Sequence, residues 1–489
     1  MEKHNKRDQG CNQPSDRLCQ HLMGDIVSNV FEEKHCGRPV LDEGHDVEGK
    51  PACLMHSCNP SKSAREFQEE FERIQREAGE EIADFTGFVF PTSDYSGRSF
   101  AAKCRFTDAV FCQKAGFFRA VFAQEADFSR VRFDKDAVFG AVFSRGASFV
   151  GARFTEDANF AHCTFVGRAN FLYCRFAGAV QFDETKFLRE SQSGKDPIPI
   201  FCRAVFEKPQ RSVFYQTDLG YALFHNCDIS AVNFSDVTWH RRSNGKSMCF
   251  EELIDPNKWQ LDPPPDAKEF LSPASRKRFM ARRFEQLTHG APQSMRPREG
   301  DPNPRNYRLI AELYQRLKTN YDSRCDYWTA GDFHYGEMEM KRLASRRRSR
   351  LLRWLHSHAG LVAWYKYASE YGESYVRPSL WLSLVLLLFT VLYPAVGLRT
   401  DTNPNKQAVE TLTYSHPLKS ANDTRRVWQA RLDLMLNSGL TTVEVALLQR
   451  NPSYEPSYRR GRFLMLFELV LSSTLGALVL LAVRRQLKR

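Results

Sequence analysis

The chain has 489 residues, a formal net charge of +11 and 13 cysteines. This length is enough for several domains, so different segments are free to do different work. All the cysteines precede Asp326 and the N-terminus is hydrophilic, which argues against a secreted scaffold built on disulfides.

Three cysteines and a histidine near the N-terminus have the chemistry of a metal site. Cys53 and His56 stand one short turn apart, and Cys36 precedes a glycine that frees the backbone beside a ligand. With Cys19 they predict a closed, structural Zn2+ site in a zinc-ribbon-like module over residues 1–62. Other candidate ligands are Cys11 (in place of Cys19), His21, His35, His45 and Cys58. The alternative is a disordered tail whose cysteines bind no metal.

Residues 63–83 are rich in charge but place Phe67, Phe71, Ile74 and Ala78 at helical spacing. We expect a lead-in helix that covers the first layer of the domain that follows. Such a cover is needed because an open β-edge invites aggregation.

An aromatic residue returns every five or six positions from Phe85 to Phe187, apart from one shorter step from Phe139 to Phe143. Neither a helical period nor strand alternation gives this spacing, so it indicates a solenoid in which each unit buries one large side chain. Alanine or cysteine commonly stands two positions earlier, which suits a narrow β-core of large and small side chains. The aromatic residues are Phe85, Phe90, Tyr95, Phe100, Phe106, Phe111, Phe117, Phe122, Phe128, Phe133, Phe139, Phe143, Phe149, Phe154, Phe160, Phe165, Phe171, Phe176, Phe182 and Phe187.

The repeating unit resembles the A(D/N)-Leu/Phe-x-x motif of the pentapeptide-repeat family, with clear copies beginning at Ala83, Ala126 and Ala169. The resemblance implies a right-handed quadrilateral β-helix with one unit per side and four per coil. The alternation of five and six residues implies an extra residue at every second corner. We expect this β-helix over residues 84–239, with about five coils, an insertion near 188–200 and up to two more coils.

The N-terminal module also resembles the short Cys-rich module that precedes the repeats in some bacterial membrane proteins of the family. Some other pentapeptide-repeat proteins are acidic mimics of DNA that bind topoisomerases. Between Tyr95 and Phe187, however, acids and bases nearly balance, so the acidic excess that such mimicry needs is absent. We therefore expect no nucleic-acid partner.

Residues 240–304 are rich in proline and arginine and predict a flexible linker. Residues 305–376 resemble the helical neck of the same bacterial family, with one helix over about 306–323 and a second over about 327–354. A single hairpin of this kind cannot bury its apolar face alone. We therefore expect it to pack on a partner subunit or on the β-helix of residues 84–239, called the rod below. His334 and Glu337 are expected to form a surface pair.

Residues 377–489 contain two apolar stretches, 379–398 and 463–483, each about 20 residues long and able to cross ~30 Å of hydrocarbon. The alternative is a pair of buried helices in a soluble core. Basic residues are concentrated before the first stretch and after the second. This predicts a multi-pass protein of the bacterial inner membrane with both termini in the cytoplasm. The loop between the two spans would then be extracytoplasmic.

Residues 427–448, in that loop, form an amphipathic pattern, and the plan of span, helix, turn and span resembles two-span cation channels. Thr441, Thr442, Val443 and Glu444 stand where a channel keeps its filter, but the glycines of a potassium filter are missing. The segment is either a pore-like loop or a structural loop. Glu468, inside the second span, is either an intramembrane functional acid or a side chain that reaches the interface.

The sequence contains no phosphate loop, nucleotide fingerprint or nucleophile elbow, so we expect no enzyme activity. The first hypothesis is a membrane-anchored protein whose cytoplasmic β-helix is a scaffold for an unknown partner protein. The second is a homo-oligomeric, two-span, channel-like protein regulated by the rod. The third, disfavoured, is a DNA mimic.

Overall fold

The structure, a computed structural model, describes residues 18–19, 22–27, 30–42, 44–46, 49–189, 199–253, 307–344, 350–400, 411–414, 424–449, 454–456 and 459–488. The chain forms two compact units, each described by itself below. One unit comprises Met1–Arg324 with Asp332–Met340, and the other comprises Cys325–Gly331 with Lys341–Arg489.

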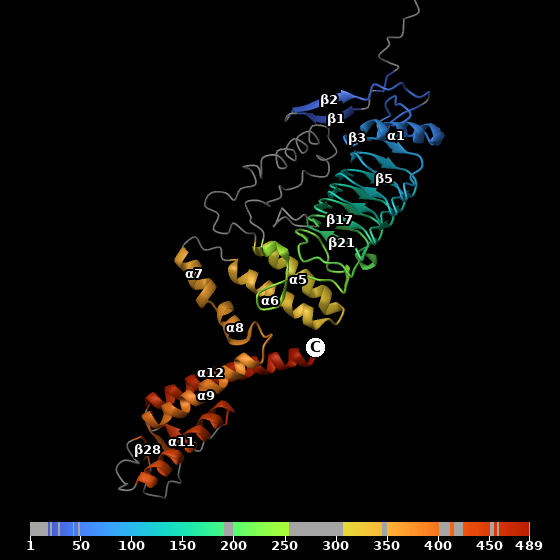
Figure 1. Cartoon of the computed structure of the whole chain (residues 1–489). Coiled ribbons are helices and arrows are strands. Elements are labelled where there is room, and N and C mark those ends of the chain that lie inside the picture. The colour runs from blue at the N-terminus through green and yellow to red at the C-terminus, as the bar shows by residue number, and fades with distance from the viewer. Residues whose placement is uncertain are drawn as a thin grey trace, which may run out of the picture. The chain divides into compact units, whose positions relative to one another are not determined.

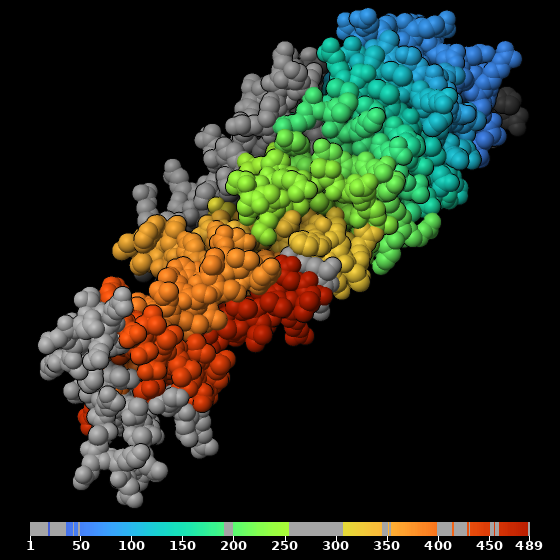
Figure 2. Space-filling model, turned by 60° about the horizontal axis from the view of Figure 1, so that its bottom comes forward, coloured from blue at the N-terminus to red at the C-terminus, as the bar shows by residue number. Residues whose placement is uncertain are grey.

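The first unit contains a β-solenoid of four parallel sheets, which confirms the predicted quadrilateral β-helix (Figure 1). Each strand pairs with the strand one coil later, commonly 21 or 22 residues on, as Phe111 does with Phe133 and Phe133 with Phe154. Successive coils are therefore stacked in chain order, which the colour gradient from blue to green follows along the solenoid (Figure 2). About seven coils lie between residues 82 and 235.

The strands of the four sheets are short because each coil turns four corners. The first sheet contains β3 (Ile82–Asp84), β6 (Lys103–Arg105), β10 (Ala126–Asp127), β14 (Ala147–Ser148) and β18 (Ala169–Asn170). The second contains β4 (Val89–Phe90), β7 (Val110–Phe111), β11 (Arg132–Phe133), β15 (Arg153–Phe154), β19 (Arg175–Phe176) and β22 (Val205–Phe206). The third contains β8 (Ala115–Gly116), β12 (Ala137–Val138), β16 (Ala158–Asn159), β20 (Val180–Asp183), β23 (Val213–Tyr215) and β24 (Asn233–Ser235). The fourth contains β5 (Ser99–Phe100), β9 (Val121–Phe122), β13 (Val142–Phe143), β17 (Thr164–Val166) and β21 (Lys186–Leu188).

The aromatic residues of the ladder form four stacked columns in the core, and all of them are buried. Phe128 is typical: its ring centroid lies 4.7 Å from that of Phe106 and 5.1 Å from that of Phe149, with nearly parallel planes. These distances match the ~4.8 Å spacing of neighbouring strands, so backbone pairing and ring stacking reinforce each other. The small residues, such as Ala126, fill the space between the columns.

The corners explain the alternation of five and six residues. In the five-residue steps the second residue after the phenylalanine has a left-handed φ, as Asp108 (60°) and Arg130 (59°) do. The amide of Ala109 then donates to the carbonyl of Phe106 at 3.0 Å, which closes a type II turn. The six-residue steps place one more residue at the corner, as the sequence predicted.

The insertion after Phe187 does not break the register of the solenoid. Residues 190–198 lie outside the described part of the chain, and Ile200 bridges to Asn170 on one side and to Leu223 on the other. Two further coils follow, as expected, and the last is closed by the bridge between Asp218 and Thr238. The short helix η2 (Pro209–Arg211) bulges from one of their corners.

Helix α1 (Ala64–Ala78) covers the first coil. It begins at the N-cap Ser63, whose hydroxyl oxygen accepts from the amide of Glu66, and it ends where Gly79 takes a positive φ of 55°. Phe71 packs 4.5 Å from the Phe85 ring, and Phe67 packs against the same end of the core. The helix is shorter than the predicted segment 63–83, because the first strand already begins at Ile82.

Helices α5 (Tyr307–Ser323) and α6 (Tyr327–Leu343) provide the cover at the other end. The indole of Trp239, the last ladder residue, donates to the hydroxyl of Tyr321 at 2.8 Å. The buried amide of Asn320 donates to the carbonyls of Ile229 (2.9 Å) and Val232 (2.7 Å). Of the two expected packing partners for this hairpin, the structure shows the rod.

The structure corrects two boundaries of the neck region. The second helix does not continue to residue 354, because α6 ends at Leu343 and a separate helix α7 (Arg350–Ala359) follows. Residues 240–253, assigned to the linker by sequence, are ordered as β25 (His240–Arg241), β26 (Ser247–Met248) and η3 (Phe250–Glu252), and the rest of that linker lies outside the described residues.

The second unit contains α7, α8 (Leu361–Ser369), α9 (Val376–Val396), α11 (Thr424–Ala446) and α12 (Arg459–Lys488). Its small sheet joins β27 (Leu398–Thr400) to β28 (Thr411–Leu412) and β29 (Tyr454–Pro456). Helices α9 and α12 run antiparallel: β27 and β29 pair at one end, and Arg485 contacts Glu373 (3.3 Å) at the other. In the described part of the chain, α9 and residues 459–487 of α12 are long and apolar enough to cross a membrane, with mean hydropathies of 2.1 and 2.2.

Replacing Phe128 with alanine should destabilise the solenoid by ~3–5 kcal/mol, because the cavity removes contacts with two neighbouring coils. Phe118→Ala is the matched control, since the Phe118 side chain is exposed on the surface of the same solenoid. Hydrogen exchange of the solenoid amides in the purified full-length protein measures both. Equal protection in the two variants would show that ring burial does not hold the coils together.

Asn320→Ala should destabilise the end cover by ~1–3 kcal/mol, because two buried carbonyls lose their donor. Thr319→Ala is the control, since Thr319 is exposed and bonds only to its own helix. Faster exchange confined to the last coil and α5 is the expected signature. Unchanged exchange in this region would mean that the amide does not secure the cover.

Candidate metal centre

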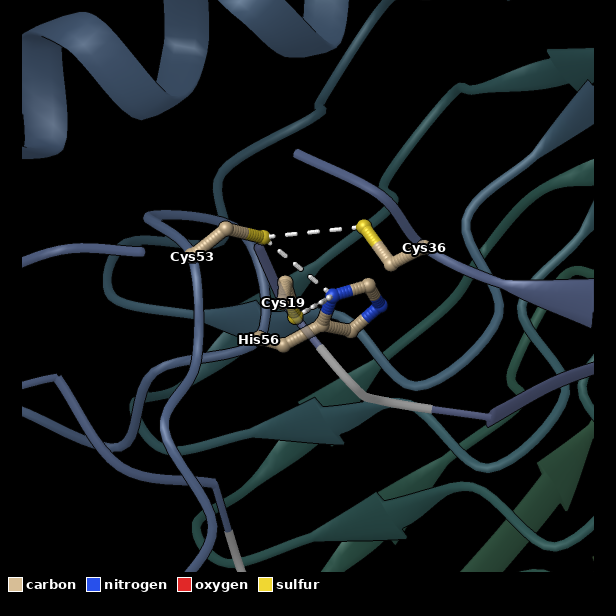
Figure 3. Close-up of side chains that lie close together, drawn as sticks. All are labelled: Cys19, Cys36, Cys53 and His56. Atoms are coloured by element: carbon tan, nitrogen blue, oxygen red, sulfur yellow. Dashed lines mark hydrogen bonds between the residues drawn. The ribbon is translucent and has the colours of Figure 1, made fainter. Parts of the chain in front are cut away.

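Cys19, Cys36, Cys53 and His56 come from three separate segments and meet at the N-terminal end of the solenoid unit. Their ligand atoms all lie within 4.8 Å of one another (Figure 3). The group could hold a metal ion. Among the residues described, it is the one group of at least three candidate metal ligands that lie close together.

Backbone hydrogen bonds join the first two segments to each other and shape the turn of the third. The amide of Cys19 donates to the carbonyl of Arg38 at 2.7 Å, and the amide of Gly37 returns to the carbonyl of Cys19 at 3.2 Å. Gly37 has a φ of 68°, so the turn after Cys36 uses the freedom that the sequence predicted for it. The amide of His56 donates to the carbonyl of Cys53 at 3.1 Å, which closes the tight turn between these two ligands.

The distances between the ligand atoms suit a tetrahedral ion. Metal–sulfur bonds of ~2.3 Å and metal–nitrogen bonds of ~2.0 Å give edges of ~3.8 Å between sulfurs and ~3.5 Å between sulfur and nitrogen. Cys36 Sγ lies 3.8 Å from Cys53 Sγ, and His56 Nδ1 lies 3.6 Å from Cys19 Sγ and 3.3 Å from Cys53 Sγ. Around a tetrahedral ion these four donors would leave no ligand position for a substrate.

The other ring nitrogen of His56 anchors this cluster to the solenoid. Nε2–H donates to the carbonyl of Thr86 in the first coil at 3.0 Å, which leaves Nδ1 with its lone pair toward the sulfurs. The imidazole also packs edge-on against Phe88, with ring centroids 5.2 Å apart. The orientation of this ligand is thus fixed by the same coil that α1 covers.

Two cations near the cluster escaped the sequence analysis. The guanidinium of Arg38 donates to Cys36 Sγ at 3.5 Å and pairs with Glu70 of α1 at 3.3 Å, so it would offset part of the negative charge of the thiolates that bind a metal ion. The buried ammonium of Lys62 donates to the carbonyls of Leu54 (3.0 Å) and Ser57 (2.8 Å) and also to that of Val89. Only the position of Arg38 beside Cys36 and Gly37 offered a sequence signal.

Protons compete for the same donor atoms. Burial alone would lower the pKa of His56, but hydrogen bonds to the Cys19 and Cys36 thiols outweigh it and raise the pKa to about 9. Hydrogen bonds to Cys19 and Cys36 raise the pKa of the Cys53 thiol as well. A metal ion must displace these protons, so its binding weakens as the pH falls.

The remaining candidate ligands do not join the cluster. Cys11 and His21 lie outside the described residues, and of His35 only the backbone is described. His45 and Cys58 are exposed and are not part of the group. His334 and Glu337 lie 3.7 Å apart, but both side chains are mostly buried, so the expected surface pair is wrong.

The pore-like loop is also corrected. Thr441, Thr442, Val443 and Glu444 belong to helix α11, which extends to Ala446. The hydroxyls of Thr441 and Thr442 donate to the carbonyls of Asn437 (2.9 Å) and Ser438 (3.0 Å), four residues earlier. Helical carbonyls point along the axis and bond within the helix, so they form no row of ion ligands.

Glu468 lies in α12 and its side chain faces inward rather than toward an interface. The hydroxyl of Tyr393 in α9 donates to Glu468 Oε2, and the residue is fully buried. Its second oxygen, Oε1, is buried without a hydrogen-bond partner. The contact joins the two long apolar helices to each other.

The family described as pentapeptide repeats (9 copies) matches residues 139–186, inside the solenoid and about a tenth of the chain. No curated protein and no solved structure matches the chain.

Cys53→Ser should abolish tetrahedral metal binding, because a hydroxyl replaces the thiolate that lies beside both Cys36 and His56. Cys58→Ser is the control, because that thiol is exposed and outside the cluster. With Co2+, the thiolate–metal absorption of the full-length protein should survive only in the control and should fade on acidification. Equal absorption in the two variants would place the metal elsewhere.

Proposed function

Because the β-solenoid of this chain belongs to the pentapeptide-repeat family, we propose that the protein is a non-enzymatic scaffold whose rod binds a partner protein and whose C-terminal helices hold it to a membrane. The observation that carries this proposal is that helices cover both ends of the rod. The rod cannot lengthen by stacking on another, and its core is filled with phenylalanine. Its four sides remain as the surface for recognition.

Ion pairs between successive coils give these sides alternating positive and negative charges with little net charge. Lys135 pairs with Glu156 at one corner, and Lys103 pairs with Glu125 at the opposite corner, both at 2.7 Å. Neutralised corners suit a protein partner with a matching charge pattern. They do not suit a DNA mimic or a nucleic-acid ligand, which need an excess of one sign.

The membrane part of the proposal rests on α9 and α12. Most of their large apolar side chains point outward, as those of Leu387 and Phe467 do, which hydrocarbon favours and water does not. Arg377 and Arg484 flank the ends that lie on one side of this antiparallel pair. By the positive-inside rule this side is the cytoplasm of a bacterial cell, which then contains the rod and both termini.

The channel alternative is weaker. It requires a homo-oligomer around a pore and a filter between the two spans, and the helical conformation of residues 441–444 supplies no filter. A homo-oligomer without conductance remains compatible with a scaffold. The mass of the protein in mild detergent tests the oligomer directly.

The metal site is assigned to Zn2+ in a structural role. Three thiolates and one imidazole in a closed tetrahedron are the donors that zinc prefers, and the site fastens the N-terminal module onto the first coil. One zinc ion per chain in freshly purified protein is the expected result of metal analysis.

Reversing an ion pair tests the scaffold role without removing a contact. The double variants Lys135→Glu/Glu156→Lys and Lys103→Glu/Glu125→Lys keep each pair but invert the local charge pattern. We expect unchanged hydrogen exchange in both, and loss of the co-purifying partner in the variant that alters the binding side. Full partner retention in both variants would show that the partner does not recognise these corners.

The anchor is tested separately by alkaline extraction of membranes. The full-length protein should stay in the membrane fraction, and a chain ending at Tyr371 should be released. Release of the full-length protein would contradict the membrane part of the proposal.

A further inference from the structure

Helix α11 exposes a stripe of large apolar side chains and buries several polar ones. Large apolar side chains recur every three or four residues on its outer face, and they are strongly exposed: Trp428 is 68% exposed and Leu436 62%. The same stripe includes Leu432, Leu440 and Val443. The opposite face, buried in the bundle, carries Ser438, Thr441 and Thr442 together with Leu434 and Val445. A helix on the surface of a soluble protein shows the opposite arrangement.

A proline in α9 explains why a serine stands on the inner face. Pro394 has no amide hydrogen, so the carbonyl of Thr390 lacks its normal donor four residues later. The hydroxyl of Ser438 donates to this carbonyl at 2.6 Å. The neighbouring carbonyl of Val391 accepts from the hydroxyl of Tyr414 at 2.6 Å. Water would satisfy the Thr390 carbonyl at a solvated site, whereas in hydrocarbon a side chain has to do so.

This contact also sets the depth of α11. Thr390 stands six residues before Val396, the last residue of α9, which corresponds to ~9 Å along the helix. If α9 crosses the membrane, its partner Ser438 lies below the headgroups. No charged residue occurs from Leu434 to Val443, and Glu444, which ends this stretch, is buried.

We propose that α11 enters the membrane beside α9 and that its exposed apolar stripe contacts lipid acyl chains. The inference rests on the proposed membrane anchor and adds a third embedded helix to it. The uncharged stretch spans ~15 Å, about half of the ~30 Å hydrocarbon layer, so α11 enters without crossing. Its exposed Arg431 and Asp433 lie toward the headgroups. The stripe continues the apolar outer surfaces of α9 and α12, against which α11 packs.

Photo-crosslinking identifies what covers the stripe. Benzoylphenylalanine replaces Leu436 on α11, Leu387 on the outer face of α9, or Phe118 on the solenoid, one position at a time, in the full-length protein in phosphatidylcholine vesicles. We expect phospholipid adducts at Leu436 and Leu387 and none at Phe118, detected by the mass of the adduct.

The outcomes separate this inference from the proposed function. Lipid adducts at Leu387 but none at Leu436, or a crosslinked dimer at Leu436, would overturn the placement of α11 and leave the anchor standing. No lipid adduct at either position would overturn both.

A second measurement tests the docking contact. Ser438→Ala should reduce the lipid adduct at Leu436, because the orphaned carbonyl of Thr390 loses its donor. Adding Pro394→Ala returns an amide to α9 and should restore the adduct. Unchanged adduct yield in Ser438→Ala would show that this hydrogen bond does not hold α11 in place.

Discussion

The fold depends on one geometric match, between the stacking distance of phenylalanine rings and the spacing of parallel strands. Phe90 and Phe111 stack at 4.4 Å, and Phe139 and Phe160 at 4.6 Å, close to the ~4.8 Å between coils. Each ring is buried only because another coil lies above and below it. The two end coils therefore lack a neighbour, and α1, the cysteine cluster and the α5–α6 hairpin all exist where that need arises.

The solenoid could be predicted from sequence because its signal repeats at short range. Phe85 and every later ladder residue report the same local environment, so a stacked core follows from the period, and its four sides follow from the resemblance to the pentapeptide-repeat family. The end cover could not be predicted in detail, since Tyr321 is distant in the chain from its partner Trp239, as Asn320 is from Val232, and nothing near these residues identifies the partner. For the same reason Cys53 and His56 were recognisable as a pair, whereas the anchor at Thr86 was not.

The second unit shows a different limit. Hydropathy predicts α9 and α12, and the spacing of Trp428, Leu432 and Leu436 predicts an amphipathic α11, but the pattern does not tell which face turns inward. The filter-like reading of residues 441–444 failed because threonines bond readily to carbonyls of the preceding helical turn. Which face of α11 turns inward depends instead on Pro394 in α9, whose missing amide hydrogen leaves a carbonyl for Ser438.

The distance in sequence between the solenoid and its second cover has a consequence for synthesis. The last coil ends at Trp239, but Asn320 and Tyr321 leave the ribosome about 80 residues later. At ~5–20 residues per second, the open edge of the last coil stays uncovered for roughly 4–16 s. During that interval its unpaired strands can join those of a neighbouring nascent chain. Slow translation of residues 254–306 would lengthen this exposure, and early membrane targeting, which separates nascent chains, would limit it.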